Sequence, residues 1–481
     1  MSRNEILLAM GGLVLLSAAK WRWSVQVALV ITVFEGVLRK WVFPGAGQYI
    51  YFLKDFVLLG AYIGYYTAAI PKRSGLNPAL KITLVLGCAA VVLQAFNPNL
   101  GSIVTGVFGI KAYLWYVPLL WILPEVFRNK SELFRFTDWF IRLAVPLGIL
   151  AMVQFQAPLD SPLNAYAANT EAVSSFGEDG THAQVTGTFS YIAGYTSFLF
   201  FTFCLLAANL LGSQKPIVVW SNAAILCLVL GNMCMSGGRK NFVCIGLSLA
   251  VLSVVVLKHR QMLPGLHRTL LAVAVAVGLA LMLFDTAVDA MMYRARSNED
   301  FIERTMLFMP LIDNLKKLGL DSYGAGLTLA ERSELWSALN VAPPRSLPPS
   351  MDFEANQVLV ELGAVGFLAW YSLRIALLWA LWATWQRLQD PRLKVLAAGA
   401  FTFHLAHLYL STYLNHIANL YLWFMAGFIL LLPRLDSNKK IPLSSEVRRA
   451  ARRRRPAAKL AEAPLAASGV KPRFGESGKA P

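Results

Sequence analysis

The sequence predicts an all-α polytopic membrane protein with about 13 (12–14) transmembrane helices and a large, partly helical outer loop. Of its 481 residues, 56% are hydrophobic and only 15% are charged. A soluble domain carries about 45–50% apolar and about 25% charged residues. The apolar residues gather in blocks of roughly 16–25 with almost no charge, which is the length that a helix needs to cross a bilayer. A transmembrane β-barrel would show alternating polarity instead.

Thirteen such blocks follow one another along the chain. The first is followed by Lys20 and Arg22 and hardly preceded by cations, which is the reverse of a signal peptide, so we expect it to be retained as a helix. The expected helices cover approximately 5–19, 24–40, 49–70, 80–96, 108–127, 137–156, 188–211, 217–236, 241–257, 269–285, 355–383, 395–414 and 418–433.

These helices divide the chain into four regions. Residues 1–285 hold helices 1–10 with an outer loop at about 157–187, residues 286–354 form a large periplasmic loop, and residues 355–435 hold helices 11–13. Residues 436–481 form a basic tail. Downstream of Asp436 it carries twelve Lys or Arg against three Glu, which is about half of the net charge of +17. This composition predicts a disordered cytoplasmic tail that touches anionic lipid headgroups. Nothing in it favours a nucleic-acid partner.

A cytoplasmic tail assigns a side to every loop. All the loops then placed in the cytoplasm are basic, as the positive-inside rule requires. They contain Lys20/Arg22, Lys72/Arg73, Arg128/Lys130/Arg135, Lys215, Lys258/Arg260/Arg268 and Arg387/Arg392/Lys394. The sequence therefore predicts a multi-pass protein of the bacterial inner membrane with a periplasmic N-terminus and a cytoplasmic C-terminus.

Several cations lie on the outer side, where this rule disfavours them. They are Arg39 and Lys40 after the second helix, Arg239 and Lys240 after Ser236-Gly237-Gly238, and Arg294, Arg296 and Arg304 at the start of the large loop. Cations held there indicate an anionic ligand. The alternative is snorkelling to lipid headgroups together with local pairing, such as Glu35 with Arg39 at i,i+4.

The two glycines allow a tight turn that would place backbone N–H groups and the Arg239 guanidinium at the start of the next helix. The helix dipole is positive there, and a guanidinium binds a diphosphate bidentately. Asp352 and Glu354 at the end of the large loop and Asn356 at the start of helix 11 alternate with Phe353 and lie at the entrance to the bilayer. A carboxylate at that place is a candidate general base, and the alternative is an ordinary helix cap by Asp352 or Asn356.

These residues resemble the O-antigen polymerase and O-antigen ligase superfamily of bacterial surface-polysaccharide assembly. The similar segments are the Ser236–Arg239 turn, the Arg304 segment, Tyr323-Gly324-Ala325-Gly326, Glu354-x-Asn356-x4-Glu361-x-Gly363-x2-Gly366, Glu35 to Pro44 and Gly187 to Tyr191.

The resemblance implies a glycosyltransferase that uses a glycan on undecaprenyl diphosphate and needs no metal and no cofactor. Arg239, Arg304 and Glu354 would be catalytic, and Arg39, Lys40, Lys240, Arg294, Arg296, Tyr323 and Asn356 would bind substrate. The bilayer, a chain-length regulator and a flippase are the expected partners. Ligases of this family carry a His near the position of Asn356, and Glu354 stands there instead, which favours a polymerase over a ligase.

A transporter or flippase of lipid-linked oligosaccharide is the alternative from another class. Lys54, Asp55 and Arg142 inside expected helices would mark an ion path, but no internal repeat is evident, and a transporter is expected to have one. His404 and His407 are expected to bond between helices, since no third metal ligand accompanies them. The five cysteines show no CxxC spacing and predict neither disulfides nor a metal site.

Overall fold

The computed structural model describes residues 3–68, 75–167, 173–178, 180–212, 215–238, 240–259, 265–296, 311–312, 314–316, 322–328 and 353–437. Nearly all of this part is helical, and its only strands are the two-residue pair β1 (Ser175–Phe176) and β2 (His182–Ala183), which lie antiparallel. Arg239, Arg304, Asp352 and the basic tail after 437 lie outside the described residues.

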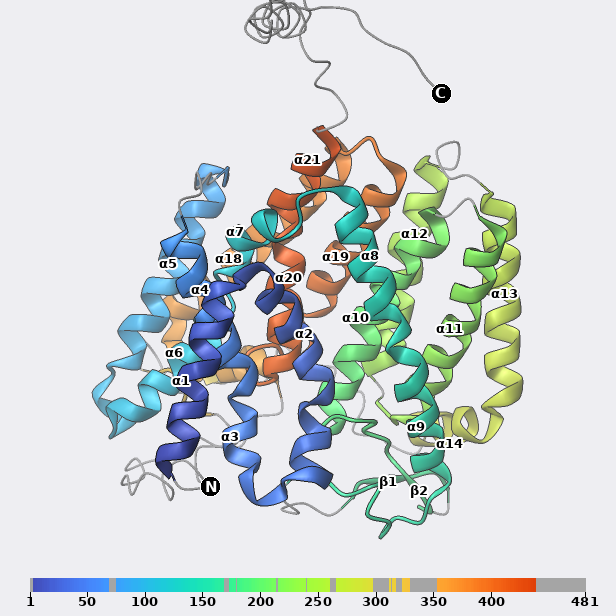
Figure 1. The fold of residues 1–481 in the computed structure, drawn as a ribbon, viewed down its shortest axis with the longest axis horizontal. Coiled ribbons are helices and arrows are strands. Elements are labelled where there is room, and N and C mark those ends of the chain that lie inside the picture. Colours follow the sequence, from blue (N-terminus) through green and yellow to red (C-terminus); the bar gives the residue numbers. More distant parts are fainter. Residues whose placement is uncertain are drawn as a thin grey trace, which may run out of the picture. The chain divides into compact units, whose positions relative to one another are not determined.

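The helices follow one another in a single helical unit that ends at Asp436 (Figure 1). They are α1 (Arg3–Ala19), α2 (Trp21–Val37), the π-helix η1 (Leu38–Val42), the 3-10 helix η2 (Pro44–Ala46), α3 (Gly47–Tyr51), α4 (Leu53–Thr67), α5 (Pro78–Ala95), η3 (Pro98–Leu100), α6 (Ile103–Leu114), α7 (Leu119–Val126), α8 (Lys130–Arg142), α9 (Ala144–Gln156), α10 (Ile192–Gly212), α11 (Pro216–Met235), α12 (Lys240–His259), α13 (Leu266–Leu283), α14 (Asp285–Arg296), α18 (Glu354–Arg387), α19 (Pro391–Ala406), α20 (His416–Ala426) and α21 (Phe428–Ser437).

Each expected block coincides with one of these helices or with a broken pair such as α6 and α7. Seven helices of the described part are long and apolar enough to cross a membrane, or eight if the bent pair α6–α7 is one span. The expected count of about thirteen is therefore not confirmed. The difference arises from five short apolar segments. Helices α1, α2, α4 and α19 are only 15–17 residues long, and the apolar part of α12, Val243–Lys258, has a similar length.

The connections alternate between two ends of the helical unit (Figure 1). We call the end with η1, α3, β1, β2 and α14 the loop face. The opposite end, with the starts of α8 and α19 and the end of α21, is the tail face. The loop face thus collects the segments that the sequence places outside the membrane, and α14 confirms that the large loop is partly helical.

Small residues allow close packing where helices cross. Gly60 and Gly64 of α4 lie against the backbone of α1 at Val14 and Ala18, and a Cβ on Gly64 would come 2.2 Å from the Ala18 carbonyl oxygen. Without a hydrophobic driving force in lipid, such close contacts are a main source of helix association. The most enclosed span is α10, which packs against α8, α11, α19 and α20. This packing fixes the helix ends that carry the polar groups described next.

Candidate functional site

The π-helix η1 follows α2 directly and contains Arg39 and Lys40. π-Turns inside helices are frequent at functional sites. Arg39 Nη1 donates to Ser190 Oγ at 3.1 Å and lies 3.6 Å from Glu35 Oε1. The local pairing of Glu35 with Arg39 is therefore present. Arg39 Nε is buried and has no hydrogen-bond partner in the described part of the chain.

Lys40 is buried on the other side of the same turn. Its ammonium donates to Thr186 Oγ1 at 2.9 Å and to the Gly187 carbonyl oxygen at 3.1 Å. It also lies 4.5 Å from the centre of the Trp41 ring. The segment 186–190, which follows β2, therefore holds both cations through its hydroxyl and carbonyl oxygens.

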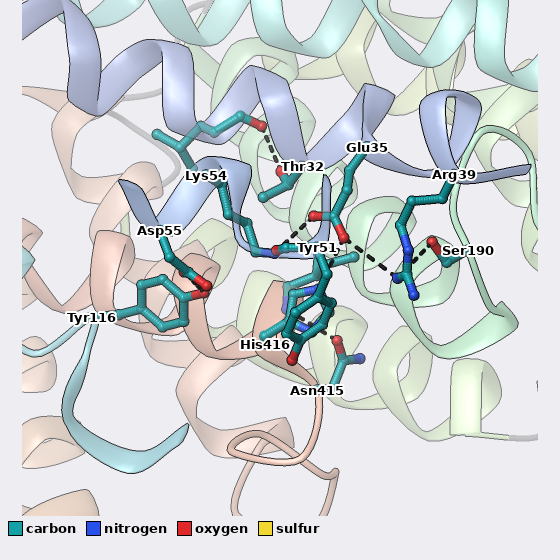
Figure 2. A network of polar contacts seen from close by, with 12 residues as sticks. Thr32, Glu35, Arg39, Tyr51, Lys54, Asp55, Tyr116, Ser190, Asn415 and His416 are labelled. Atoms are coloured by element: carbon teal, nitrogen blue, oxygen red, sulfur yellow. Dashed lines mark hydrogen bonds and ion pairs between the residues drawn. The ribbon is translucent and has the colours of Figure 1, made fainter. Parts of the chain in front are cut away.

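Further charged side chains lie beside Arg39 (Figure 2). Lys54 Nζ donates to Glu35 Oε2 at 2.7 Å and to the Tyr51 carbonyl oxygen at 2.8 Å. The neighbouring Asp55 lies 2.9 Å from Lys111 Nζ and accepts from the Tyr116 hydroxyl at 2.8 Å. Four helices, α2, α4, α6 and α20, converge on this network, which we call the Tyr51 cluster: Glu35, Arg39, Tyr51, Lys54, Asp55, Lys111, Tyr116 and His416.

The Tyr51 ring organises the cations of the cluster. Arg39 Cζ lies 5.4 Å, Lys54 Nζ 4.7 Å and Lys111 Nζ 4.5 Å from its centre. The His416 ring meets it edge-on at 4.7 Å. An aromatic face attracts cations through its quadrupole, so the ring gathers three positive charges in one place.

Three cationic side chains of the cluster face only two carboxylates. Glu35, Lys54 and Asp55 are almost completely buried. His416 Nε2 is buried 3.9 Å from Glu35 and makes no hydrogen bond among the described residues. An excess of buried positive charge is costly unless it is compensated. The Tyr51 cluster is therefore suited to an anion.

The turn before α12 forms the second group of outer cations. Gly237 adopts φ +64°, which only glycine adopts readily, and the side chains of Arg294 and Gln184 flank it. A hydrogen bond of 3.3 Å from Val185 N to the Met235 carbonyl oxygen joins this turn to the segment that holds Lys40. The structure thus brings Arg294 to the glycine turn. Lys240, at the start of α12, and Arg296, at the end of α14, are exposed.

Glu354 begins α18 and is buried in an ion pair. One oxygen accepts from Arg374 of the same helix, and the other accepts from the backbone N–H groups of Thr412 and Tyr413, the latter at 3.1 Å. Arg374 also donates to Thr412 Oγ1 at 2.8 Å. Both carboxylate oxygens are therefore occupied. The residue before α18 is Phe353 without a side-chain cap, so Asn356 does not cap this helix.

Tyr323 and Asn356 lie near the break of α18 at Gly363, where φ is 69°. The break leaves the carbonyl oxygens of Val360 and Glu361 to accept from Tyr323 N at 2.9 Å and Gly324 N at 3.1 Å. The Glu361 carboxylate accepts from the Tyr113 hydroxyl at 2.9 Å and from Thr328 N at 2.6 Å. Asn356 Oδ1 is buried without a hydrogen-bond partner in the described part. Two segments with the family resemblance are thus packed together.

The other polar residues that the sequence singled out inside helices are His404, His407 and Arg142. His404 Nε2 lies 3.1 Å from the Leu422 carbonyl oxygen of α20, which confirms the expected bond between helices. His407 Nδ1 lies 2.7 Å from the Phe403 carbonyl oxygen of its own helix, so the expectation is wrong for this ring. Arg142 is exposed at the end of α8. No group of three possible metal ligands occurs within the described ranges.

No family model, curated protein or solved structure matches the chain. The case for a function therefore depends on the residues themselves. Arg39, Lys40 and, as a possible ion path, Lys54 and Asp55 are residues that the sequence alone indicates. Tyr51, Lys111 and His416 were not predicted, although a lysine inside an apolar block, such as Lys111, is a usable signal. Arg374, the partner of Glu354, was not predicted either.

Proposed function

We propose that this protein is a polymerase of undecaprenyl-diphosphate-linked oligosaccharide repeat units, of O-antigen, capsule or exopolysaccharide, at the outer face of the bacterial inner membrane. The observation that carries the proposal is the excess of positive charge around Tyr51, where three cationic side chains face two carboxylates. A diphosphate is a dianionic or more highly charged ligand that such an excess would compensate. The resemblance of the Tyr323 and Glu354–Gly366 segments to the polymerase and ligase superfamily supports the same assignment.

In this proposal the loop face is periplasmic, the N-terminus is periplasmic and the C-terminus is cytoplasmic. All thirteen helical blocks cross the membrane. A helix of 17 residues rises about 25 Å, which is shorter than an average hydrocarbon core of about 30 Å but within reach of local bilayer thinning. The short helices α1, α2, α4, α12 and α19 are then spans as well.

The reaction moves the anomeric carbon of the donor glycan from the diphosphate oxygen to an acceptor hydroxyl. Undecaprenyl diphosphate leaves, and the hydroxyl proton passes to a carboxylate. Arg39 and Lys40, with Arg239, Lys240, Arg294, Arg296 and Arg304, would stabilise the charge that gathers on the leaving diphosphate. No metal and no cofactor enters this scheme.

Glu354 is the proposed base, and Tyr323 and Asn356 are proposed sugar contacts. A base must have a lone pair directed at the proton that it removes. Thr412 N and Tyr413 N occupy one oxygen of Glu354, and the other oxygen accepts from Arg374 and keeps one lone pair. The acceptor hydroxyl would therefore have to reach this second oxygen beside Arg374.

The proposal is tested with purified protein in liposomes that contain lipid-linked repeat units, scored for chain growth. Removing one donor that stabilises a developing negative charge typically costs about 100- to 1,000-fold in rate. We expect Arg39→Gln to lower chain growth about 100-fold and Arg39→Lys to recover part of it, because an ammonium keeps the charge but not the planar fork. Arg387→Gln, an exposed cation at the tail face, is the matched control. Wild-type protein that moves substrate but never lengthens it would refute the polymerase.

One observation favours a second candidate, a transporter or flippase of lipid-linked oligosaccharide. The buried pairs Lys54–Glu35 and Lys111–Asp55 are ionisable groups within the helical unit, and such groups often mark translocation paths. The same liposomes separate the two, since a flippase would change the sidedness of labelled lipid-linked substrate without forming longer glycans. A ligase-type transferase would transfer the glycan only when a lipid acceptor other than the repeat unit is added.

A further inference from the structure

A groove of about 790 Å³ opens between α2 and α8. Both helices run from the tail face toward the loop face (Figure 1). The lining residues differ between the two ends of the groove. Its lining comes from the α1–α2 junction, α2, the end of α7 and the first turns of α8. It is separate from the Tyr51 cluster, whose residues do not line it.

The end of the groove at the tail face is cationic. Its charged lining consists of Lys20, Arg22, Arg128, Arg135 and a single carboxylate, Glu132. Glu132 accepts from the Arg128 backbone N–H at 2.8 Å and from Asn129 Nδ2 at 3.1 Å, while Arg22 Nε donates to the Glu125 carbonyl oxygen at 2.8 Å.

The other cations of this end have no such partners. Lys20, Arg128 and Arg135 are exposed, and their charged groups make no ion pair or hydrogen bond with any residue that the structure describes. Two of them are guanidinium groups, which bind phosphate oxygens bidentately. This end is therefore complementary to a phosphate.

The rest of the groove is open and, apart from Gln26, apolar. Trp23, Val27, Val30, Phe136 and Trp139 line it, and Trp23 is 69%, Val27 43% and Trp139 46% exposed. From residue 20 to residue 30, α2 rises about 15 Å, which is half of a hydrocarbon core of about 30 Å. The apolar part thus matches the depth of one leaflet, with the cations at its headgroup end.

We propose that this groove is a binding site for one anionic glycerophospholipid, with its phosphate between Arg128, Arg135 and Lys20 and an acyl chain along Val27, Val30 and Trp139. A zwitterionic headgroup would bring no net charge to the cationic end. A soluble phosphate would leave the apolar part empty. The site does not depend on the reaction proposed above, and its lipid comes from the leaflet at the tail face.

The test is photo-crosslinking of the full chain in liposomes at subsaturating lipid, with phosphatidylglycerol or phosphatidylcholine that carries a diazirine on one acyl chain. We expect crosslinks in 20–30 and 132–139, several-fold stronger for phosphatidylglycerol. The crosslinked peptides are identified one by one, so that lipid held by the basic tail is scored separately from lipid in the groove. Excess glycerol phosphate should not compete, because it has no acyl chain.

Three single variants and one double variant make the test specific. A basic side chain near an anionic headgroup is worth about 1 kcal/mol, or about fivefold. Arg128→Gln and Arg135→Gln should each lower the phosphatidylglycerol crosslinks about fivefold without affecting phosphatidylcholine. Arg387→Gln, an exposed arginine of the same face outside the groove, should change nothing. Equal crosslinking of the two lipids, competition by glycerol phosphate, or full crosslinking in the Arg128→Gln/Arg135→Gln double variant would each overturn the proposal.

Discussion

The Glu354–Arg374 pair illustrates how much a single buried charge demands. Arg374 is 5% and Glu354 is 2% exposed, and the two share their remaining hydrogen bonds with Thr412, Tyr413 and the His407 carbonyl oxygen. The pair thus ties α18 to the connection between α19 and α20. Breaking a buried pair by removing one partner typically costs about 3–5 kcal/mol, because the other charge stays buried without compensation.

The first prediction concerns this pair. Glu354→Gln should lower the thermal stability of the purified protein strongly, on the order of 3 kcal/mol, because Arg374 is left uncompensated. Glu354→Gln/Arg374→Met should recover most of the loss, since it leaves no uncompensated charge buried. The measurement is the unfolding temperature of both variants in detergent.

The same variants separate a structural role from a base. If Glu354 acts as base, the double variant regains stability but elongates glycans about 100- to 10,000-fold more slowly than the wild type. If its role is structural alone, stability and chain growth return together. A Glu354→Gln protein as stable as the wild type would contradict the ion-pair argument.

At the scale of elements, the contact of α2 with the segment 186–190 positions the cations of the site. Gly36 of α2 lies so close to this segment that a Cβ would be 2.1 Å from the Thr188 carbonyl oxygen, and Thr188 Oγ1 donates to the Val33 carbonyl oxygen at 2.5 Å. Arg39 and Lys40 bond to residues of the same segment. The approach of two backbones at Gly36 therefore sets the distances around η1.

The second prediction follows from this contact. Gly36→Ala should destabilise the protein by about 1–3 kcal/mol, as overpacking does, and should lower chain growth because Arg39 and Lys40 lose their positions. Gly246→Ala is the matched control in α12, where nothing lies within 4 Å of the added Cβ. It should stabilise the protein by up to about 1 kcal/mol through helix propensity. Equal unfolding temperatures for the two variants would contradict the argument.

A second junction of elements lies at the tail face. Lys130 of α8 donates to Asp390 at 2.7 Å and lies 3.6 Å from Asp436 at the end of α21. Asp390 also caps α19 by accepting from Arg392 N and Leu393 N. Burial alone would raise the pKa of Asp390, but the hydrogen bond and charge of Lys130 and the two N–H groups outweigh it and hold the pKa below its ordinary value of 3.8.

The third prediction uses the sign of this shift. A carboxylate with a lowered pKa in the folded state adds stability that is fully present above its unfolded-state pKa and is lost as pH falls through its folded-state pKa. Asp390→Asn should therefore lower the free energy of unfolding at pH 7 by up to about 1 kcal/mol, which is measured as a lower unfolding temperature. The difference between the variant and the wild type should disappear progressively below pH 3.8. Asn retains the cap. The exposed Asp160→Asn should show no such difference, and a gap for Asp390→Asn that is constant with pH would exclude the ion pair as its source.

At the scale of the whole molecule, the sequence was sufficient to locate the helices, because a bilayer requires long apolar blocks. It also located Arg39 and Lys40, because they violate the charge rule for loops. It could not locate Lys111 and His416 beside Tyr51, since their proximity depends on how α3, α6 and α20 pack. The partner of Glu354 was hidden for another reason. In a straight helix, 20 residues span about 30 Å, so only the break at Gly363 lets Arg374 reach it.

The orientation in the membrane decides whether the loop face meets a periplasmic substrate, and it gives the last prediction. Ser175 is exposed at the loop face and Gln389 at the tail face. In a chain whose five natural cysteines are replaced by serine or alanine, Ser175→Cys should react with an impermeant thiol reagent in intact spheroplasts, and Gln389→Cys should react only after permeabilisation.

The physical reason is the charge of the connections. Arg128, Lys130 and Arg135 lie at the tail face, and basic loops of this kind stay cytoplasmic. Arg39 and Lys40 at the loop face are bound by the segment 186–190 and by Glu35. We therefore expect these two cations to have less effect on the orientation than the basic loops of the tail face. Labelling of Gln389→Cys in intact spheroplasts would reverse the topology. It would place the Tyr51 cluster near the cytoplasm, and a periplasmic polymerase could then not use it to hold the diphosphate of its donor.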